Sequence, residues 1–408
     1  MDAFQIGTRE PLFFMHIPKT AGMSMRQYLG EQYHPQEICP AENWQDLRGL
    51  EQDVRSFRLV RGHFRYNLRE LVAPDARMLV VLRDPLRRTV SALRHLARDP
   101  NFHPTHELAK DLTLGEMIRH EQIMSYQRDV QARFLCASRP AAEVTAYLEE
   151  AFLQHRQVDA GDHENPPDFQ RAADRLATIE FVGITEDLGS LVSAMAQEMN
   201  FHPPLYFPFA NENPERMDSL RDLTKEELDI VREHNTVDSR LYEFARKLLN
   251  WRNFVHAMRQ MVRGGVYQVP PGSFEIQIAG IMPGSGWHPA ERDQNISWRW
   301  TGPGQQFTIE VPLRQDASYR FGMTFSDPRP AGPGHLTVEI NDFPIAFELS
   351  IERELYRCEF DIDQALLAES SGFCRIQICT GETIQLTDSD LRRLGISVRK
   401  IEFICLEH

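Results

Sequence analysis

The sequence predicts an α/β domain, with helices on both faces of a central parallel sheet, followed by an antiparallel β-sandwich. Over the first 250 residues, short apolar runs alternate with helical patterns, as is typical of α/β sheets. Beyond residue 265, helical patterns nearly vanish and short β-rich segments recur at roughly ten-residue spacing, as in a sandwich. A chain of 408 residues also exceeds one ordinary core, which favours two domains.

Four apolar runs are the expected strands of the first domain, and they lie at 12–17, 57–62, 78–82 and 179–184. The run at 78–82, "MLVVL", is apolar throughout, as expected of a central strand covered on both faces. Helical patterns follow at 23–32, 86–98, 114–135, 141–154, 188–199 and 224–251. The polar or proline-rich stretches 157–170 and 200–216 are expected to be loops.

The second domain is expected at 265–408, after a Gly-Pro linker near "RGGVYQVPPGSF", so that the first domain spans 1–262. Its strand-like segments include "FTIEVPL", "YRFGMTF" and "CRIQIC", and Asn341-Asp342 is expected to form a hairpin turn. Trp287, Trp298 and Trp300 are interpreted as core residues of the sandwich. The alternative is a glycan-binding surface, because aromatic faces stack on sugar rings.

Composition excludes several classes of protein. A net charge of −14 argues against a general nucleic-acid binder, and no apolar run approaches the length of a membrane span. No signal peptide is visible at the N-terminus. The cysteines show no CxxC pair or zinc-like spacing, so we expect free thiols and a cytoplasmic location; they are Cys39, Cys136, Cys358, Cys374, Cys379 and Cys405.

The stretch "HIPKTAGMS" joins the first strand to the first helix through a short polar turn. Backbone N–H groups at a helix start attract anions, Gly22 permits close approach of a ligand, and Lys19 adds a positive charge. The turn therefore predicts an anion-binding loop. It lacks the GxxxxGK[ST] pattern of nucleoside triphosphatases, because its lysine precedes the glycine.

A second anion signal follows the strand at 78–82, in "RDPLRRTVSALRHL". Arg83 stands at the strand tip, and Ser91 follows two turns into the next helix. An arginine fork binds phosphate through paired hydrogen bonds, and a serine hydroxyl adds a donor. Two anion sites at adjacent strand tips predict a ligand with two separated anionic groups.

Together, "HIPKTAGMS" and "LRDPLRRTVSALRH" resemble the sulfotransferases that use 3′-phosphoadenosine 5′-phosphosulfate (PAPS), specifically the carbohydrate branch that includes heparan sulfate 2-O-sulfotransferase. The resemblance covers about residues 8–250 and implies a P-loop-like three-layer fold. It implies that the first loop binds the 5′-phosphosulfate and that Arg83 and Ser91 hold the 3′-phosphate, with Arg88 as the second arginine of the segment. The loop residues so implied are Lys19, Thr20, Ala21, Gly22 and Ser24.

The same resemblance implies the chemistry. His63, in "VRGHFRY", would be the catalytic base, its ordinary pKa suiting neutral pH, and Lys19 would stabilise the leaving oxygen. Met23 replaces the threonine usual in this loop. Segments 128–135, 181–188 and 235–245 resemble later, less specific family landmarks. No metal is implied, and the acceptor would be a hydroxyl; the family suggests a sugar, while lipid, polyketide and peptide tyrosine acceptors remain open.

Two alternatives remain open from the sequence. One is a nucleotide-dependent kinase with a degenerate phosphate loop, although no convincing set of Mg²⁺ ligands is visible at a strand end. The other is a glycan-binding protein whose nucleotide-binding domain is inactive.

Overall fold

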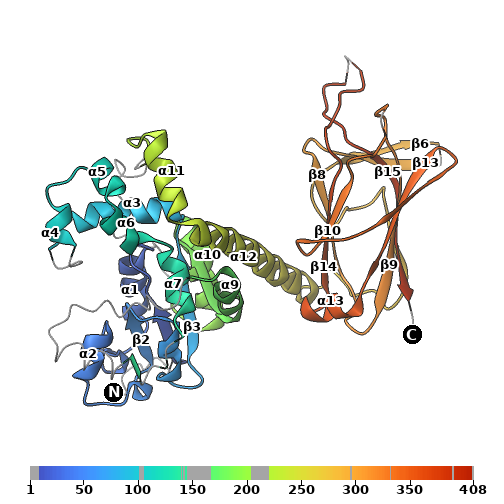
Figure 1. The fold of residues 1–408 in the computed structure, drawn as a ribbon. Helices are drawn as coiled ribbons and strands as arrows, with labels where there is room; N and C mark the ends of the chain where they lie inside the picture. Colours follow the sequence, from blue (N-terminus) through green and yellow to red (C-terminus); the bar gives the residue numbers. More distant parts are fainter. Residues whose placement is uncertain are drawn as a thin grey trace, which may run out of the picture. The chain divides into compact units, whose positions relative to one another are not determined.

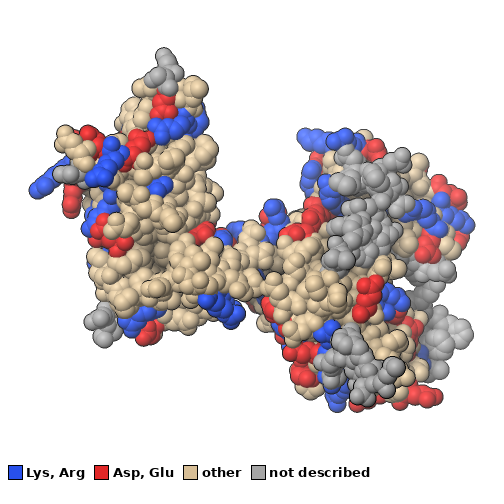
Figure 2. All heavy atoms as spheres, turned by 180° about the vertical axis from the view of Figure 1, so that it is seen from behind, with Lys and Arg blue, Asp and Glu red and all other residues tan. Residues whose placement is uncertain are grey.

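The computed structural model describes residues 9–100, 105–138, 140, 143–144, 167–203, 220–294, 296–330, 332–387 and 390–406. The chain divides into two compact units, Met1–Leu249 and Asn250–His408, and the division falls within one long helix (Figure 1). Basic and acidic side chains are intermixed on the face seen in Figure 2. Among the described residues, no helix combines the length and apolarity needed to cross a membrane.

The first unit is built on a four-stranded parallel sheet of order β2-β1-β3-β4. The strands are β1 (Leu12–Met15), β2 (Leu59–Gly62), β3 (Arg77–Leu82) and β4 (Phe181–Ile184), each within or at one of the four predicted runs. Alternate side chains of β1 enter two different apolar clusters, Phe13 and Met15 on one face and Leu12 and Phe14 on the other. The sheet is therefore buried on both faces, as a central parallel sheet requires.

Helices cover these two faces and give the predicted three layers. Helix α1 (Gly22–Gly30) and helix α10 (Leu188–Glu198) pack on one face. Helices α7 (Val130–Cys136), α9 (Phe169–Thr178) and α12 (Thr236–Arg263) pack on the other. The remaining α-helices of the described part of this unit are α2 (Trp44–Arg48), α3 (Pro85–Leu96), α4 (His106–Ala109), α5 (Leu114–Arg119), α6 (Glu121–Gln127) and α11 (Lys225–Glu233).

Two predicted helices differ from the structure, and one observed helix was not predicted. The pattern at 114–135 is not one helix but three, since His120 is extended and Asp129 has a left-handed backbone. The pattern at 224–251 is split into α11 and α12, and α12 continues to Arg263. Helix α9 was not expected. The predicted helix 141–154 and the loops 157–170 and 200–216 lie largely outside the described residues.

The second unit is the predicted antiparallel sandwich. One sheet has the order β12-β13-β9-β15-β7-β6, with β5 paired to β15, and the other has the order β11-β10-β14-β8. Their strands are β5 (Phe274–Ile276), β6 (Trp287–Asp293), β7 (Ile296–Thr301), β8 (Gln306–Pro312), β9 (Ser318–Ser326), β10 (Thr337–Ile340), β11 (Phe343–Pro344), β12 (Glu348–Glu352), β13 (Leu355–Ile362), β14 (Phe373–Cys379) and β15 (Ser397–Leu406), with helix α13 at Gln364–Glu369.

Local details of the sandwich test two sequence interpretations. Asn341 and Asp342 have φ values of 53° and 69° between the paired β10 and β11, which confirms the hairpin turn. Trp287 packs on Phe307 in the core, with ring centroids 4.6 Å apart. Trp298 and Trp300 are only partly buried and belong to none of the apolar clusters of the described residues, so the core interpretation is wrong for these two. All six cysteines are free.

Candidate active site

The loop after β1 has the backbone of an anion cradle. Lys19 and Ala21 have φ values of 72° and 64°, and Ala21 is the N-cap of α1, where no side chain caps the helix. Left-handed residues in a turn direct N–H groups into a concavity that suits an anion. The Thr20 hydroxyl is buried and donates to the Ile17 carbonyl oxygen at 2.9 Å, so this side chain holds the turn. Ser24 is also buried, in the first turn of α1.

Gly22 allows a histidine to lie against the start of α1. A Cβ atom at this position would lie 1.5 Å from His16 Nε2, so any side chain would displace the imidazole. The His16 ring packs in turn against the His63 ring, with centroids 4.3 Å apart and the ring planes tilted by 30°. His63 Nδ1 lies 3.0 Å from the His16 carbonyl oxygen. Because a carbonyl can only accept, Nδ1 carries the hydrogen and Nε2 of neutral His63 keeps a free lone pair.

Both histidines are kept neutral. Burial lowers the pKa of His16 to about 3, and the charges of a protonated His63, Arg26 and Lys19 would lower it in the same direction. Desolvation also lowers the pKa of His63, although this side chain reaches solvent, and the His16 carbonyl opposes the shift. The pKa of His63 is therefore not the ordinary one expected from sequence. It lies lower, which keeps the ring unprotonated through neutral pH.

Arg83 connects the second strand tip to the first loop. Its Nη1 donates to the Lys19 carbonyl oxygen at 3.1 Å. The Gln131 side chain holds the Arg83 backbone on both sides, accepting from its N–H at 2.8 Å and donating to its carbonyl at 2.9 Å. Nε of Arg83 is buried and has no hydrogen-bond acceptor among the described residues. An anion at this position would supply the missing acceptor.

The other residues predicted around the 3′-phosphate differ in accessibility. Ser91 is partly buried on α3, and that helix begins at Pro85 with Asp84 as its cap. Arg88 is only 1% exposed and donates to the Gln127 carbonyl and side-chain oxygens at 3.1 and 3.2 Å. A phosphate in solvent could not reach Arg88 without rearrangement. Met23 points outward at 57% exposure, away from the loop interior.

The three later landmark segments meet behind Arg83 and Asp84. Asp129 accepts from the N–H groups of Val237 and Asp238 at the start of α12, both at 2.9 Å. Asp238 in turn accepts from the N–H groups of Gln131 and Ala132 at the start of α7, at 3.1 and 2.7 Å. The two helix starts thus cap each other. This reciprocal cap fixes Gln131, which holds the Arg83 backbone.

The segment 181–188 supports the same strand tip. Glu186 accepts from the Asp84 N–H at 3.3 Å and from the Tyr242 hydroxyl at 2.9 Å. The Glu186 carboxylate, which follows β4, therefore links the backbone of Asp84 to Tyr242 on α12. The segments 128–135, 181–188 and 235–245 thus together hold the end of β3 in place.

A cavity of about 330 Å³ lies along α1 and β2, near the two histidines. It is lined by Met23, Arg26, Gln27, Gly30 and Arg61. Arg61 stands two residues before His63 and donates to the Arg26 carbonyl at 2.7 Å, while the Arg26 guanidinium pairs with Glu42. Within the described ranges, no three His, Cys, Asp or Glu side chains are grouped as a metal site.

The structure thus brings together Lys19, Thr20, Ala21, Gly22, Ser24, His63 and Arg83, while Arg88 lies buried behind them. From the sequence, His16 is interpreted as a structural residue and Gln131 is not singled out, whereas in the structure they contact His63 and Arg83. The usable signal for His16 was its place directly before the loop. Gln131 gave no signal, because only the fold brings it to β3.

Most of the first unit matches the model of a known protein family. The model of the Sulfotransferase family matches residues 2–245. A solved sulfotransferase from Alicyclobacillus acidocaldarius is 16% identical, with a TM-score of 0.26 over 56% of this chain and 97% of that chain. No curated protein matches the chain.

Two other solved structures resemble a smaller part of the chain. The GH26-CBM35 β-(1,4)-mannanase of Podospora anserina is 10% identical, with a TM-score of 0.21 over 34% of this chain and only 29% of that chain. A family 35 carbohydrate binding module from Clostridium thermocellum is 10% identical, with a TM-score of 0.18 over 32% and 87% of the two chains. At these values, neither likeness says what this chain binds. The family match spans more than half of the sequence, and the chain therefore belongs to the sulfotransferase family.

Proposed function

We propose that the protein transfers the sulfuryl group of PAPS to an acceptor hydroxyl on a carbohydrate. One observation supports the donor assignment: the ends of the neighbouring strands β1 and β3, where the sequence predicts the two anion sites, are joined by the hydrogen bond from Arg83 to the Lys19 carbonyl. PAPS carries two separated anionic groups, the 5′-phosphosulfate and the 3′-phosphate. In this assignment the first loop takes the phosphosulfate and Arg83 takes the 3′-phosphate.

Each donor-site residue has a proposed task. The N–H groups from Lys19 to Ser24 bind the phosphosulfate, with Thr20 and Gly22 shaping the turn for them. Arg83 Nε and the Ser91 hydroxyl donate to the 3′-phosphate. Arg88 is proposed to position this site from behind, because it is buried against Gln127. The outward Met23 side chain leaves the backbone cradle intact.

The proposed transfer is an in-line displacement at sulfur. The acceptor oxygen forms a bond to sulfur as the bond from sulfur to the 5′-phosphate oxygen breaks, and the electron pair leaves with that oxygen. His63 Nε2 accepts the acceptor's proton, since Nδ1 is held by the His16 carbonyl. Lys19 and the loop N–H groups stabilise the negative charge that grows on the leaving phosphate. No residue in this scheme requires a metal.

The carbohydrate acceptor rests on the sequence resemblance and on two features of the chain. The cavity along α1 and β2 is lined by Arg26 and Arg61, whose guanidinium groups can donate to sugar hydroxyls or acidic substituents. On the sandwich, Trp298 and Trp300 are partly exposed on alternate positions of β7 and share one face. We propose that this face holds a glycan, so that the second unit is an accessory module.

The test of the proposed function is direct. The protein is incubated with PAPS and a panel of glycans, lipids and phenols, and release of adenosine 3′,5′-bisphosphate is followed. Sulfation of at least one glycan is expected, and release with a non-sugar acceptor alone would reject the carbohydrate assignment. The bisphosphate should also raise the melting temperature more than adenosine 5′-phosphate does. Equal shifts would contradict the role given to Arg83 and Ser91.

A further inference from the structure

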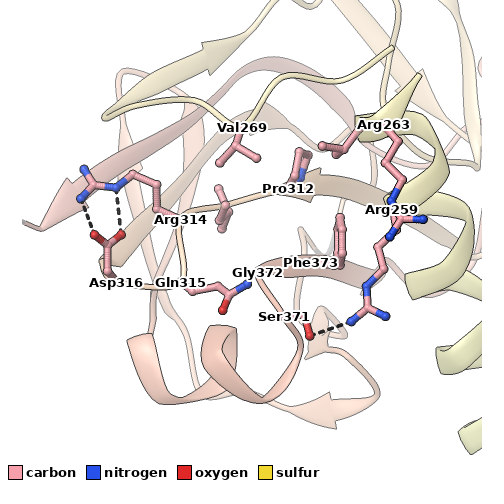
Figure 3. Close-up of a pocket in the computed structure, with 12 residues that line it drawn as sticks. Arg259, Arg263, Val269, Pro312, Arg314, Gln315, Asp316, Ser371, Gly372 and Phe373 are labelled. Carbon is pink, nitrogen blue, oxygen red and sulfur yellow. Dashed lines mark hydrogen bonds and ion pairs between the residues drawn. The ribbon is translucent and has the colours of Figure 1, made fainter. Parts of the chain in front are cut away.

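The second unit carries a groove of about 660 Å³ that the proposed transfer reaction does not use (Figure 3). It lies between the C-terminal turns of α12, the segment after β8 and the segment before β14, and all of its lining residues fall within 250–408. Its volume is within the range of small-molecule sites, roughly 300–1,000 Å³.

The walls of the groove are mainly aliphatic. Val262, Val269, Pro312 and Leu313 line it, together with Phe373, which is only 6% exposed. Val269 is 43% exposed and faces the opening in Figure 3. No tryptophan or tyrosine is part of the lining, so the groove lacks the open aromatic face on which sugars stack. These walls favour an alkyl group over a sugar.

The rim of the groove is positively charged. Arg314 is compensated, because Asp316 accepts from it twice at 2.9 Å. Arg259 donates only to the neutral Ser371 hydroxyl, at 2.8 Å, and Arg263 has no hydrogen bond or ion pair with the described residues. These two guanidinium groups therefore keep their full positive charge at the rim of the groove. They stand four residues apart on α12, so they are neighbours on one helix face.

We propose that this groove binds an amphiphilic anion, a molecule with an aliphatic body and one carboxylate, sulfate or phosphate group. The aliphatic body lies against Val262, Val269 and Leu313, and the anionic group is bound by Arg259 and Arg263. A nucleic acid would need a track of phosphate contacts, whereas this rim offers two uncompensated cations beside the carboxylate of Asp316. The ligand is either a free amphiphile or a lipid in a membrane, which present the same chemistry.

The test uses the full chain and three probes in calorimetric titration, at concentrations below micelle formation. Octyl sulfate carries both parts of the ligand, octyl glucoside only the chain, and inorganic sulfate only the head group. Octyl sulfate should bind at least about tenfold more tightly than either of the others, and added salt should weaken it. Equal affinity for octyl glucoside and octyl sulfate would overturn the proposal.

Substitutions in the groove test whether octyl sulfate binds there. Arg259→Gln with Arg263→Gln should weaken octyl sulfate about tenfold, as expected for losing two charged donors. The matched control is Arg246→Gln with Lys247→Gln, which removes the same charge from exposed positions of α12 outside the groove and should change nothing. Val269→Asp places a repelling charge on the exposed wall and should also weaken binding. Unchanged affinity in the arginine pair, shown to be folded, would overturn the assignment.

A vesicle assay distinguishes the two sources of the ligand. Vesicles of phosphatidylglycerol and of phosphatidylcholine are sedimented with the protein. Sedimentation with phosphatidylglycerol alone, lost in the arginine pair, would identify a membrane lipid. Octyl sulfate binding without any sedimentation would identify a free amphiphile. Sedimentation that survives in the arginine pair would show that another surface meets the lipid and would contradict this groove as the lipid site.

Discussion

At the scale of single residues, the proposed base depends on a neighbour that is itself inert. His16 is partly buried and neutral, and it offers His63 both a ring contact and a carbonyl acceptor. The carbonyl fixes the tautomer of His63, and burial lowers its pKa. His16 therefore acts as a positioning residue in the proposed mechanism.

His63→Ala should separate binding from chemistry. The donor's anionic groups are assigned to the first loop and to Arg83, so bisphosphate affinity should change little, while turnover falls by roughly 10²–10⁴. In the wild type, protonation inactivates the base, and the lowered pKa moves that loss to a pH below the ordinary value of about 6.5. The rate should therefore hold through neutral pH and fall only under more acidic conditions. Near-wild-type turnover in a folded His63→Ala protein would remove His63 as the base.

Gly22→Ala tests the contact beneath the loop. The added methyl group would overlap His16 Nε2, and overpacking of this kind costs about 1–3 kcal/mol. The melting temperature should fall by several degrees. In a His16→Ala background the same change should cost less, by at least about 1 kcal/mol. Equal losses in both backgrounds would mean that the loop, and not the imidazole, excludes a side chain.

At the scale of secondary structure elements, α7 and α12 stabilise each other through their first turns. Asp129 and Asp238 each accept hydrogen bonds from backbone N–H groups at the start of the other's helix. Burial raises the pKa of Asp238, and the positive charge of the buried Arg88 opposes this rise. The paired starts hold Gln131, and Gln131 holds the Arg83 backbone. The position of the Arg83 backbone therefore depends on a cap more than forty residues along the chain from Arg83.

Asp238→Ala should destabilise the first unit strongly. It removes the acceptor for two buried N–H groups, each of which typically costs about 1–3 kcal/mol when left without a partner. It also removes one of the two carboxylates, Asp238 and Asp129, whose charge offsets the burial of the Arg88 guanidinium. Adding Arg88→Met should recover part of this loss, because the buried charge is then removed as well. Chemical denaturation of the three variants measures both effects. A double variant no more stable than Asp238→Ala would show that the lost caps account for the whole cost.

The strands were the most predictable elements. β1 to β4 follow from apolar runs, because a parallel strand buried on both faces must be apolar on both. Helix boundaries were less predictable: the breaks near His120 and Asp129 have no Gly or Pro, and the left-handed turn at Asp129 is stabilised by a partner 108 residues away. The turn between β1 and α1, which carries the proposed anion loop, could be predicted from local sequence. The burial of Arg88 and the packing of His16 against His63 could not, because both depend on tertiary contacts.

At the scale of the whole molecule, the two units share α12. Leu241 and Ala245 pack in the core of the first unit, whereas Phe254 and Met258 pack with Phe373 in the second. The sequence suggested a boundary at the Gly-Pro stretch after residue 262, and we propose that the fragment 1–262 folds and binds adenosine 3′,5′-bisphosphate. The second unit as the structure divides it begins earlier, at Asn250.

Fragments of the second unit test where its folding boundary lies. The fragment 250–408 keeps Phe254 and Met258 over Phe373, whereas 265–408 exposes that ring. Each buried apolar side chain of this size contributes about 1.5–3 kcal/mol, so 250–408 should melt clearly higher. The matched control is the fragment 250–408 with both Phe254→Ala and Met258→Ala. Its melting temperature should approach that of the fragment 265–408. Equal melting of 250–408 and 265–408 would place the boundary at the Gly-Pro stretch.

The packing of the two histidines also affects how the enzyme recovers after each turnover. If His63 takes a proton from each acceptor, it must lose that proton before it can work again. A base whose pKa is lowered by its surroundings accepts a proton less readily but releases it to water faster at neutral pH. His16, with a pKa of about 3, cannot retain the proton in its place. In the proposed mechanism, the two histidines would therefore favour rapid loss of the proton over the strength of the base.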